Sequence, residues 1–261
     1  MITAGFWKSI NQEACVKKPI ISKCDILGTR IAAVNMSVAL RFIKNNLKEL
    51  KGNYICISNV HTTVMSYDDT SYRKIQNEAV LALPDGKPLS VVCRKKGFPE
   101  AGRVTGPDLM GEIFRCSREL GYTHYFYGST PETLERLRER LEAEYRLSIA
   151  GMYAPPFRQL TQEEDRKAVE RINQARPDFV WVGLGAPKQE RWMYGHRDKV
   201  QGLMIGVGAG FDYFAGNIKR APLWMQKYSL EWLYRLLQDP RRLFKRYLVT
   251  NTKFLYWMIA K

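Results

Sequence analysis

The sequence has few of the residues from which disulfide frameworks and metal centres are built. Its five cysteines are scattered over 261 residues without a C-x-x-C pair, and its three histidines lack the spacing of metal ligands. An odd number of dispersed cysteines indicates neither a disulfide framework nor a zinc site, and it suits a reducing cytoplasm. We therefore expect a cytoplasmic protein without a structural metal or cofactor.

Long apolar runs are also missing. No stretch approaches the ~20 apolar residues that a helix needs to cross a bilayer. Residues 1–18 mix Trp7, Asn11 and Glu13 with apolar residues, so they lack the continuous apolar segment of a signal peptide. The sequence thus predicts neither a membrane span nor a signal peptide.

Acidic residues are outnumbered by basic ones. The chain has 26 Asp and Glu residues against 41 Lys and Arg residues, a formal net charge of +15, while 45% of its residues are hydrophobic. This hydrophobic content is sufficient for a folded core, as one large domain or one domain with an appendage. The positive charge favours an anionic partner, which is nucleic acid, acidic lipid or a phosphorylated substrate.

Between residues 25 and 215, short apolar runs alternate with amphipathic patterns. This alternation predicts the α/β class, with a single doubly wound, mainly parallel sheet that is Rossmann-like in architecture. We expect four or five strands in the sheet, and one of the helices should run from residue 59 toward Leu83. Strands are expected around a glycine turn in residues 24–34 and at residues 54–58, 123–129, 147–152, 177–187 and 202–212.

The turn Pro84-Asp85-Gly86 follows this expected helix. Proline fixes φ and glycine adopts positive φ, so the turn is tight and presents one carboxylate on a stiff loop. Asp85 is therefore the leading candidate for a catalytic group. The alternative is that Asp85 is an ordinary turn residue that bonds only its own backbone.

Polar residues also follow the expected strand at residues 54–58, in the position where open α/β sheets bind ligands. Asn59 and Thr62 either bind a polar ligand there or cap the next helix, and the two interpretations stay open.

Glycines mark two further positions that suit a ligand. Gly106, three residues after Arg103, precedes a helix whose N-terminal amides favour phosphate. Gly185, at the end of the most clearly buried strand, allows close approach of a ligand. Gln189, which follows it, offers a neutral donor and acceptor to sugar hydroxyls or to a uracil edge.

The composition changes at residue 217. Residues 217–261 hold ten Lys or Arg residues against two acidic ones, together with nine aromatic residues. Two expected helices, at about residues 222–238 and 240–260, interleave cations with aromatic and aliphatic side chains. This pattern is typical of an amphipathic element in an anionic membrane interface. The alternative is a helical hairpin that packs on the core and has a solvated basic face.

We therefore divide the chain into a variable leader at residues 1–24, an α/β core at residues 25–216 and a basic helical appendage at residues 217–261 that docks on membranes. No recognisable pattern in the sequence indicates the oligomeric state, so a homo-oligomer stays an open alternative.

An ordered set of motifs resembles a known enzyme family. Its members in this sequence are Asn59, Pro84-Asp85-Gly86, Arg103-x-x-Gly106-x-Asp108-Leu109, residues 183–190 (GLGAPKQE), residues 206–212 (GVGAGFD), Arg220-Ala221-Pro222, residues 231–235 (EWLYR) and Pro240-x-Arg242. The set resembles the WecG/TagA/CpsF glycosyltransferases, carbohydrate-active glycosyltransferase family 26.

The resemblance implies an inverting, metal-independent glycosyltransferase. Its donor would be a UDP-sugar carrying a hexose or N-acetylhexosamine-type sugar, such as glucose, N-acetylmannosamine or its uronate. Its acceptor would be a sugar on undecaprenyl diphosphate, at the inner face of the plasma membrane, in the synthesis of a cell-surface polysaccharide such as a teichoic acid or exopolysaccharide. The sequence has no Asp-x-Asp motif, so the commonest metal-held diphosphate site is not indicated.

The resemblance also assigns roles to individual residues. Asp85 aligns with the proposed base, and Ile57 stands where the family often has a donor-contacting threonine. The implied donor and substrate residues are Asn59, Thr62, Arg103, Gly106, Gly185 and Gln189. The residues implied to meet diphosphate oxygens are Arg235, Arg242 and either Lys245 or Arg246.

Two other functions remain alternatives. One is a basic α/β protein that binds nucleic acid, favoured by the net charge and the aromatic-basic appendage. The other is a noncatalytic sensor of sugar nucleotides. No RNA- or DNA-binding motif is recognisable in the sequence, so we expect no nucleic-acid partner.

Overall fold

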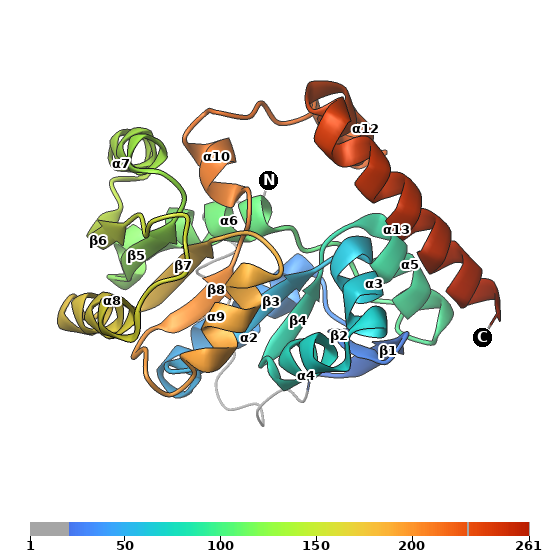
Figure 1. Cartoon of the computed structure of the whole chain (residues 1–261), viewed down its shortest axis with the longest axis horizontal. Helices are drawn as coiled ribbons and strands as arrows, with labels where there is room; N and C mark the ends of the chain where they lie inside the picture. Colours follow the sequence, from blue (N-terminus) through green and yellow to red (C-terminus); the bar gives the residue numbers. More distant parts are fainter. Residues whose placement is uncertain (1–20, 229, 261) are drawn as a thin grey trace.

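The computed structural model describes residues 21–228 and 230–260, and it is built on a sheet of six strands (Figure 1). The strands run in the order β4-β3-β8-β7-β5-β6, and every neighbouring pair is parallel. The prediction of a doubly wound parallel sheet is confirmed, although four or five strands were expected. The strands are β3 (Tyr54–Ser58), β4 (Leu81–Pro84), β5 (Thr123–Gly128), β6 (Ser148–Tyr153), β7 (Phe179–Gly183) and β8 (Leu203–Gly206).

Helices cover both faces of the sheet because side chains along each central strand alternate between two apolar clusters. Trp181 and Ile205 enter the cluster under one set of helices, whereas Val180 and Met204 enter the cluster under the other. The first set is α2 (Met36–Leu50), α6 (Gly106–Leu120), α7 (Pro131–Tyr145) and α10 (Gly210–Phe214). The second set is α4 (Thr70–Glu78), α8 (Gln162–Gln174) and α9 (Lys188–Gly195).

A third apolar cluster lies beside the β4 edge of the sheet. It joins the antiparallel hairpin β1 (Lys23–Ile26) and β2 (Thr29–Ala32) to α3 (Val60–Asp68) and α5 (Lys87–Lys95). The hairpin confirms the pair of short strands expected around the glycine turn. Phe254 of the last helix is buried in the same cluster, so this helix is anchored beside the hairpin.

The prediction of a single helix from residue 59 toward Leu83 is wrong. Asp69 ends α3 and caps α4 by accepting hydrogen bonds from the backbone N–H groups of Ser71 and Tyr72. Residues 81–84 then form β4, which pairs with β3 and is buried throughout. A short apolar run is compatible with either a helix or a strand, and here pairing with β3 decides it.

The appendage consists of three helices instead of the expected two. They are α11 (Leu223–Lys227), α12 (Glu231–Gln238) and α13 (Pro240–Ala260). The first ends where the backbone N–H of Tyr228 bonds to Trp224, and α12 begins with an acidic residue, Glu231, which suits the positive end of a helix dipole.

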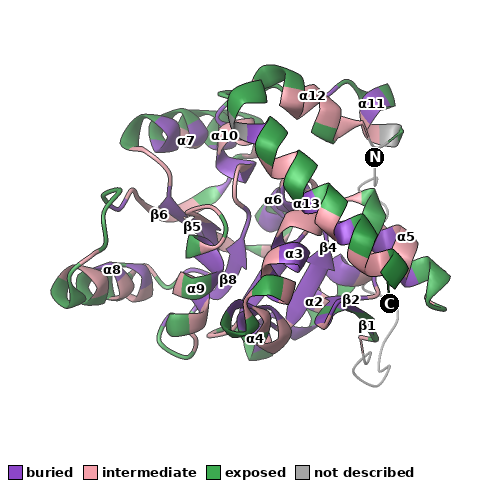
Figure 2. Ribbon diagram, turned by 45° about the vertical axis from the view of Figure 1, so that its right-hand side comes forward, coloured by how far each residue is buried: buried purple, intermediate pink, exposed green. Residues whose placement is uncertain are grey.

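The helix α13 runs beside α3 and α5 (Figure 1). Lys253 forms an ion pair of 2.8 Å with Asp68, and the rings of Trp257 and Tyr67 lie 4.1 Å apart. The inner face of α13 therefore packs on the core. Figure 2 shows exposed residues, in green, along α12 and α13. The exposed large apolar residues of the appendage are Leu223, Trp224, Tyr228, Trp232, Leu237, Phe244, Leu248, Val249, Leu255, Tyr256 and Ile259.

Among the described residues, no helix is both long enough and apolar enough to span a bilayer. Most of the expected leader, residues 1–20, lies outside the described residues. The hairpin begins at Lys23, within the leader as it was expected from the sequence.

Candidate active site

A cavity of about 930 Å³ lies between the carboxyl ends of the strands and the appendage. Its floor is formed by the segments that follow β3, β4, β7 and β8, together with the start of α6. Residues of α12 and α13 form its roof. Asn59, Thr62, Asp85, Arg103, Gly106, Gly185, Gln189, Arg235 and Arg246 all line this cavity, so most of the residues expected from the sequence converge.

Asp85 sits on a loop that is held on both sides. Its backbone N–H donates to the Ser58 carbonyl at 2.7 Å, and the Pro84 carbonyl accepts from the Val104 N–H at 2.8 Å. Gly86 has a φ of 105°, which glycine adopts without strain, and it turns the chain into α5. The turn thus follows a strand, and not a helix as expected, which places Asp85 at the edge where parallel sheets bind ligands.

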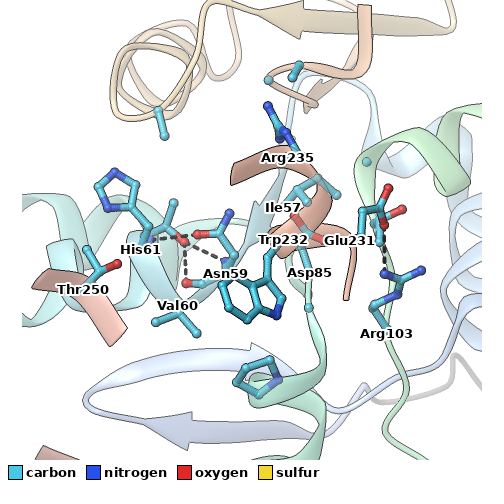
Figure 3. Close-up of a pocket in the computed structure, with 18 of the residues that line it drawn as sticks. Ile57, Asn59, Val60, His61, Asp85, Arg103, Glu231, Trp232, Arg235 and Thr250 are labelled. Carbon is cyan, nitrogen blue, oxygen red and sulfur yellow. Dashed lines mark hydrogen bonds and ion pairs between the residues drawn. The ribbon is translucent and has the colours of Figure 1, made fainter. Parts of the chain in front are cut away.

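The surroundings of Asp85 favour its neutral form. Burial raises its pKa to about 6, and the carboxylates of Glu231 and Asp108 act in the same direction. The Arg103 guanidinium and a hydrogen bond from the Asn59 side chain oppose this rise. Figure 3 shows Asp85 between Asn59 and the ion pair of Arg103 with Glu231. A carboxyl group with this pKa is ionised at neutral pH and can still accept a proton readily.

Four charged residues join the core to the appendage beside Asp85. Arg103 pairs with Glu231 at 3.1 Å and with Asp108 at 3.6 Å. Arg220 pairs with Asp108 at 2.7 Å and with Glu231 at 3.5 Å. Burial is the largest single effect and opposes ionisation of Asp108, but the hydrogen bond and charge of Arg220, the Thr105 hydroxyl and the charge of Arg103 together outweigh it and lower the pKa of Asp108. The Glu231 side chain is only 15% exposed, so α12 places a carboxylate inside the cavity.

The expected phosphate position at the start of α6 already carries an anion. Thr105 caps α6 by accepting from the Asp108 backbone N–H, and its hydroxyl donates to the Asp108 carboxylate at 2.7 Å. Gly106 lines the cavity next to this pair.

Asn59 and Thr62 form a reciprocal cap of α3. The Asn59 side chain accepts from the Thr62 backbone N–H, and the Thr62 hydroxyl accepts from the Asn59 N–H. The capping interpretation therefore holds, while the amide of Asn59 also reaches Asp85. Ile57 lines the cavity, whereas the hydroxyl of the neighbouring Ser58 points away and donates to Gln76.

Gln189 connects two of the strand ends. Its side-chain oxygen accepts from the Gly208 backbone N–H at 3.0 Å, and its nitrogen donates to Glu190 at 2.7 Å. Both polar atoms of this amide are thus engaged, and Gln189 holds the segment after β8 in place. Burial raises the pKa of Glu190, which also bonds to Tyr72.

Comparison with known proteins shows to which family the chain belongs. A sequence model of the WecG/TagA/CpsF glycosyl transferase family matches residues 24–261. This chain belongs to the WecG/TagA/CpsF glycosyltransferase family. The predicted resemblance is therefore confirmed, and the protein is a glycosyltransferase.

Two curated relatives of this glycosyltransferase share the name N-acetylglucosaminyldiphosphoundecaprenol N-acetyl-beta-D-mannosaminyltransferase. The one from Staphylococcus aureus (strain MW2) is 30% identical over 226 residues, which cover 85% of this chain and 87% of the relative. The one from Bacillus spizizenii is 28% identical over 227 residues, which cover 86% and 84%.

The expected cationic residues of the glycosyltransferase's appendage divide between two surfaces. Arg235 lines the cavity and lies over the Tyr213 ring, with 5.5 Å between the guanidinium carbon and the ring centroid. Arg246 lines it as well. Lys245 instead lies in a second, shallow groove with Arg241 and Phe244, so of the two residues left open by the sequence only Arg246 lines the cavity. The side chain of Arg242 lies outside the described residues.

Sequence reasoning gave no role in the cavity to several of its side chains, among them Glu231, Tyr213 and Trp232. Glu231 was recognised only as part of a motif, and its pairing with Arg103 spans 128 positions. Tyr213 and Trp232 line the cavity from α10 and α12. No local pattern separates these residues from other aromatic and acidic side chains. Within the described part of the chain, no group of three or more His, Cys, Asp or Glu residues is arranged to hold a metal ion.

Proposed function

We propose that this glycosyltransferase moves a hexose or N-acetylhexosamine-type sugar from a UDP-sugar to a sugar carried on undecaprenyl diphosphate. The observation that carries the proposal is Asp85, a carboxyl group with a pKa of about 6 in a cavity that arginines line. The names of the relatives support an acceptor of this kind, since both include a sugar-diphosphoundecaprenol. The transferred sugar would be glucose, N-acetylmannosamine or its uronate.

In the proposed reaction, Asp85 takes the proton of the acceptor hydroxyl as that oxygen attacks the anomeric carbon. The new carbon–oxygen bond forms while the bond from the anomeric carbon to the UDP phosphate oxygen breaks. A single displacement of this kind inverts the anomeric configuration. The pKa near 6 suits this role, because the base is ionised at neutral pH and binds the released proton.

The departing UDP accumulates negative charge, and cationic side chains can stabilise it. Arg235 lines the cavity and would approach the diphosphate of UDP, whereas Arg246, which also lines it, would approach the diphosphate of the acceptor. Arg103 is already paired with two carboxylates, so its contact with a diphosphate would require exchange of partners. The proposed reaction uses these side chains and needs no metal.

The donor is best accommodated where the floor consists of backbone. Gly185 and Gly208 line the cavity at the ends of β7 and β8, and Gln189 fixes the second of these segments. Without side chains at these positions, a planar base or a sugar can approach the main chain closely. We assign this end to the UDP-sugar.

The exposed apolar residues of the appendage and its basic side chains support a place on the cytoplasmic face of the plasma membrane. Such a surface combines aromatic side chains with cations, as is typical of proteins that lie on anionic lipid. There the enzyme would meet a lipid-linked acceptor of cell-surface polysaccharide synthesis.

A panel of UDP-sugars tests the proposal. The full chain is screened by thermal shift, and stabilising donors are then incubated with an N-acetylglucosaminyl diphosphate that carries a short lipid. We expect one donor to give a product of inverted anomeric configuration, and turnover should persist with excess EDTA. Absence of transfer with every donor, or a product of retained configuration, would overturn the proposal.

A further inference from the structure

The sheet order gives the cavity two chemically different ends. The glycine-rich ends of β7 and β8 lie on one side of β3, whereas β4, α5 and α13 lie on the other. At this second end the walls are apolar, formed by Val60, Pro88, Val91, Phe254 and Leu255. Asp85, at the end of β4, lies between the glycine-rich end and the apolar one.

One face of α13 forms the roof of the apolar end. The lining residues of this helix are Arg246, Tyr247, Thr250, Asn251, Phe254 and Leu255, which recur at the spacing of a single helical face. Their polarity changes in one direction along the helix. The cation Arg246 comes first, the polar pair Thr250 and Asn251 follows, and the apolar pair Phe254 and Leu255 comes last. A rise of 1.5 Å per residue spreads this change over about 13 Å.

The polar start of this face has unused hydrogen-bonding capacity. Among the described residues, neither Nε of Arg246 nor Nδ1 of His61 has a hydrogen-bond partner. Burial and the nearby charge of Arg246 lower the pKa of His61. The net charge at this point is therefore positive, and it comes from Arg246. Figure 3 shows His61 beside Thr250, on the opposite side of Asp85 from Arg103.

The roof is fixed to the core just beyond the cavity. Lys253 is paired with Asp68, and Phe254 is buried against α5 and the hairpin. Leu255, by contrast, is 60% exposed although it lines the cavity, so the apolar end opens to the surface. Tyr256 and Ile259, which follow on α13, are exposed as well.

We propose that this end of the cavity is a subsite for the acceptor's hydrocarbon, in which the first isoprene units after the diphosphate lie between α13 and the pair α3 and α5. The inference rests on the proposed function. A ligand with an anionic group at one end and hydrocarbon at the other matches the direction in which polarity changes along α13. The diphosphate would lie near Arg246, and the chain would leave past Leu255 toward lipid.

Hydrocarbon in the groove would bury the apolar side chains that now line an open cavity, which is favourable in proportion to the area removed from water. It would also place the acceptor sugar next to Asp85, because the diphosphate is held on the far side of the carboxylate from the donor.

Binding without any donor tests the subsite. Titration calorimetry in detergent-free buffer compares farnesyl diphosphate with inorganic diphosphate. We expect the full chain to bind farnesyl diphosphate at least tenfold more tightly. Val91→Trp fills the groove, and Leu255→Asp puts a charge at its exposed end. In each variant the affinities for farnesyl diphosphate and inorganic diphosphate should differ by less than about threefold, which corresponds to about 0.7 kcal/mol.

Phe157→Asp is the matched control, since Phe157 is 80% exposed and lies outside the cavity. It should keep the full preference for the farnesyl compound. Equal affinities in the unaltered chain, or a preference that survives both groove substitutions, would overturn the subsite. Because no sugar transfer is measured, a protein that binds farnesyl diphosphate in this way but transfers no sugar would refute only the proposed function.

Discussion

Asp85 shows how a common turn residue acquires reactive properties from its neighbours. The turn itself only fixes the direction of the carboxylate. Its pKa of about 6 comes first from burial and then from the balance between Arg103 on one hand and Glu231 and Asp108 on the other. A general base is most effective when its pKa lies near the working pH, so this balance suits the role proposed for Asp85.

Replacing Asp85 by Asn should reduce turnover by about 10²–10⁴-fold, the usual contribution of a general base. The stability of the Asn variant should instead increase. The pKa of this carboxyl is raised in the folded state, so its contribution to stability is complete below its unfolded value of 3.8 and is lost as the pH rises through 6. At pH 8 the Asn variant, which has no charge to bury, should gain about 1–3 kcal/mol of unfolding free energy.

Urea denaturation and initial rates at pH 8 measure the two effects together. Full turnover in the Asn variant would show that Asp85 is not the base. Lower stability of this variant would show that burial of the ionised carboxylate does not destabilise the fold. In the unaltered enzyme, kcat/KM should fall as the pH drops below about 6.

Glu231 should control the protonation of Asp85 from the appendage. Glu231→Gln removes a negative charge that raises the pKa of Asp85, so the acidic limb of the kcat/KM profile should move to lower pH by about 0.5–1 unit. Asp68→Asn is the control, because it breaks the Lys253 ion pair of the appendage at a distance from Asp85. An identical shift in both variants, or none in Glu231→Gln, would show that Glu231 only attaches the appendage.

Local sequence identified the site only in part. Asp85, Asn59 and Gly106 are recognisable because turns, caps and strand ends have local signatures. The partners that adjust them do not, since Glu231 reaches Arg103 from 128 positions away. Gln189 illustrates the same limit: its chemistry was evident from the sequence, but its engagement with Gly208 depends on how β7 and β8 are paired.

At the scale of elements, the buried parallel sheet could be predicted, but two helices near the site could not. The run from residue 59 to residue 83 has enough apolar residues for a helix, and only the break at Asp69 and the pairing of Leu81–Pro84 with β3 make its end a strand. The expected helix over residues 222–238 is likewise divided. The division matters because it starts α12 at Glu231, inside the cavity.

The packing of α9 against β8 gives a test at this scale. A methyl group at Gly206 would lie 2.7 Å from the Met193 side chain and 3.1 Å from the Gln189 amide nitrogen. Gly206→Ala should therefore displace Gln189, destabilise the fold by about 1–3 kcal/mol and weaken UDP binding. Gly195→Ala is the matched control on α9, because that position has no atom within 4 Å and alanine favours helices by up to about 1 kcal/mol.

Denaturation and UDP titration of both variants decide the question. Unchanged UDP affinity in a folded Gly206→Ala protein would mean that Gln189 does not shape the donor end.

For the whole molecule, the sheet and the appendage contribute different residues to the cavity. The segments after the strands contribute Asp85 and the glycine-lined end, while the appendage contributes Arg235, Arg246, Glu231 and the apolar roof. The same appendage exposes apolar side chains on its outer surface. One face of α13 packs on the core, as the alternative of a packed helical hairpin predicted, while docking of the appendage on a membrane stays a prediction.

Binding to membranes should depend on the outer groove of the appendage, where Arg241 and Lys245 lie beside Leu237 and Phe244. Vesicles that contain phosphatidylglycerol should retain the protein, and vesicles of phosphatidylcholine alone should not. Each basic residue near an anionic surface contributes about 1 kcal/mol, so the double substitution Arg241→Ser with Lys245→Ser should weaken flotation by roughly thirtyfold. Arg118→Ser with Lys199→Ser removes two exposed cations elsewhere and should have little effect.

Salt and a competing polyanion complete this test. Raising the ionic strength from 0.1 M to 1 M shortens the screening length from about 10 Å to about 3 Å, so vesicle binding should weaken while the apolar contribution remains. A nucleic-acid-binding protein would instead bind single-stranded RNA through the same cations and would lose all binding in salt. Retention of RNA at the affinity seen for vesicles, abolished by the Arg241 and Lys245 substitutions, would contradict a membrane role for the appendage.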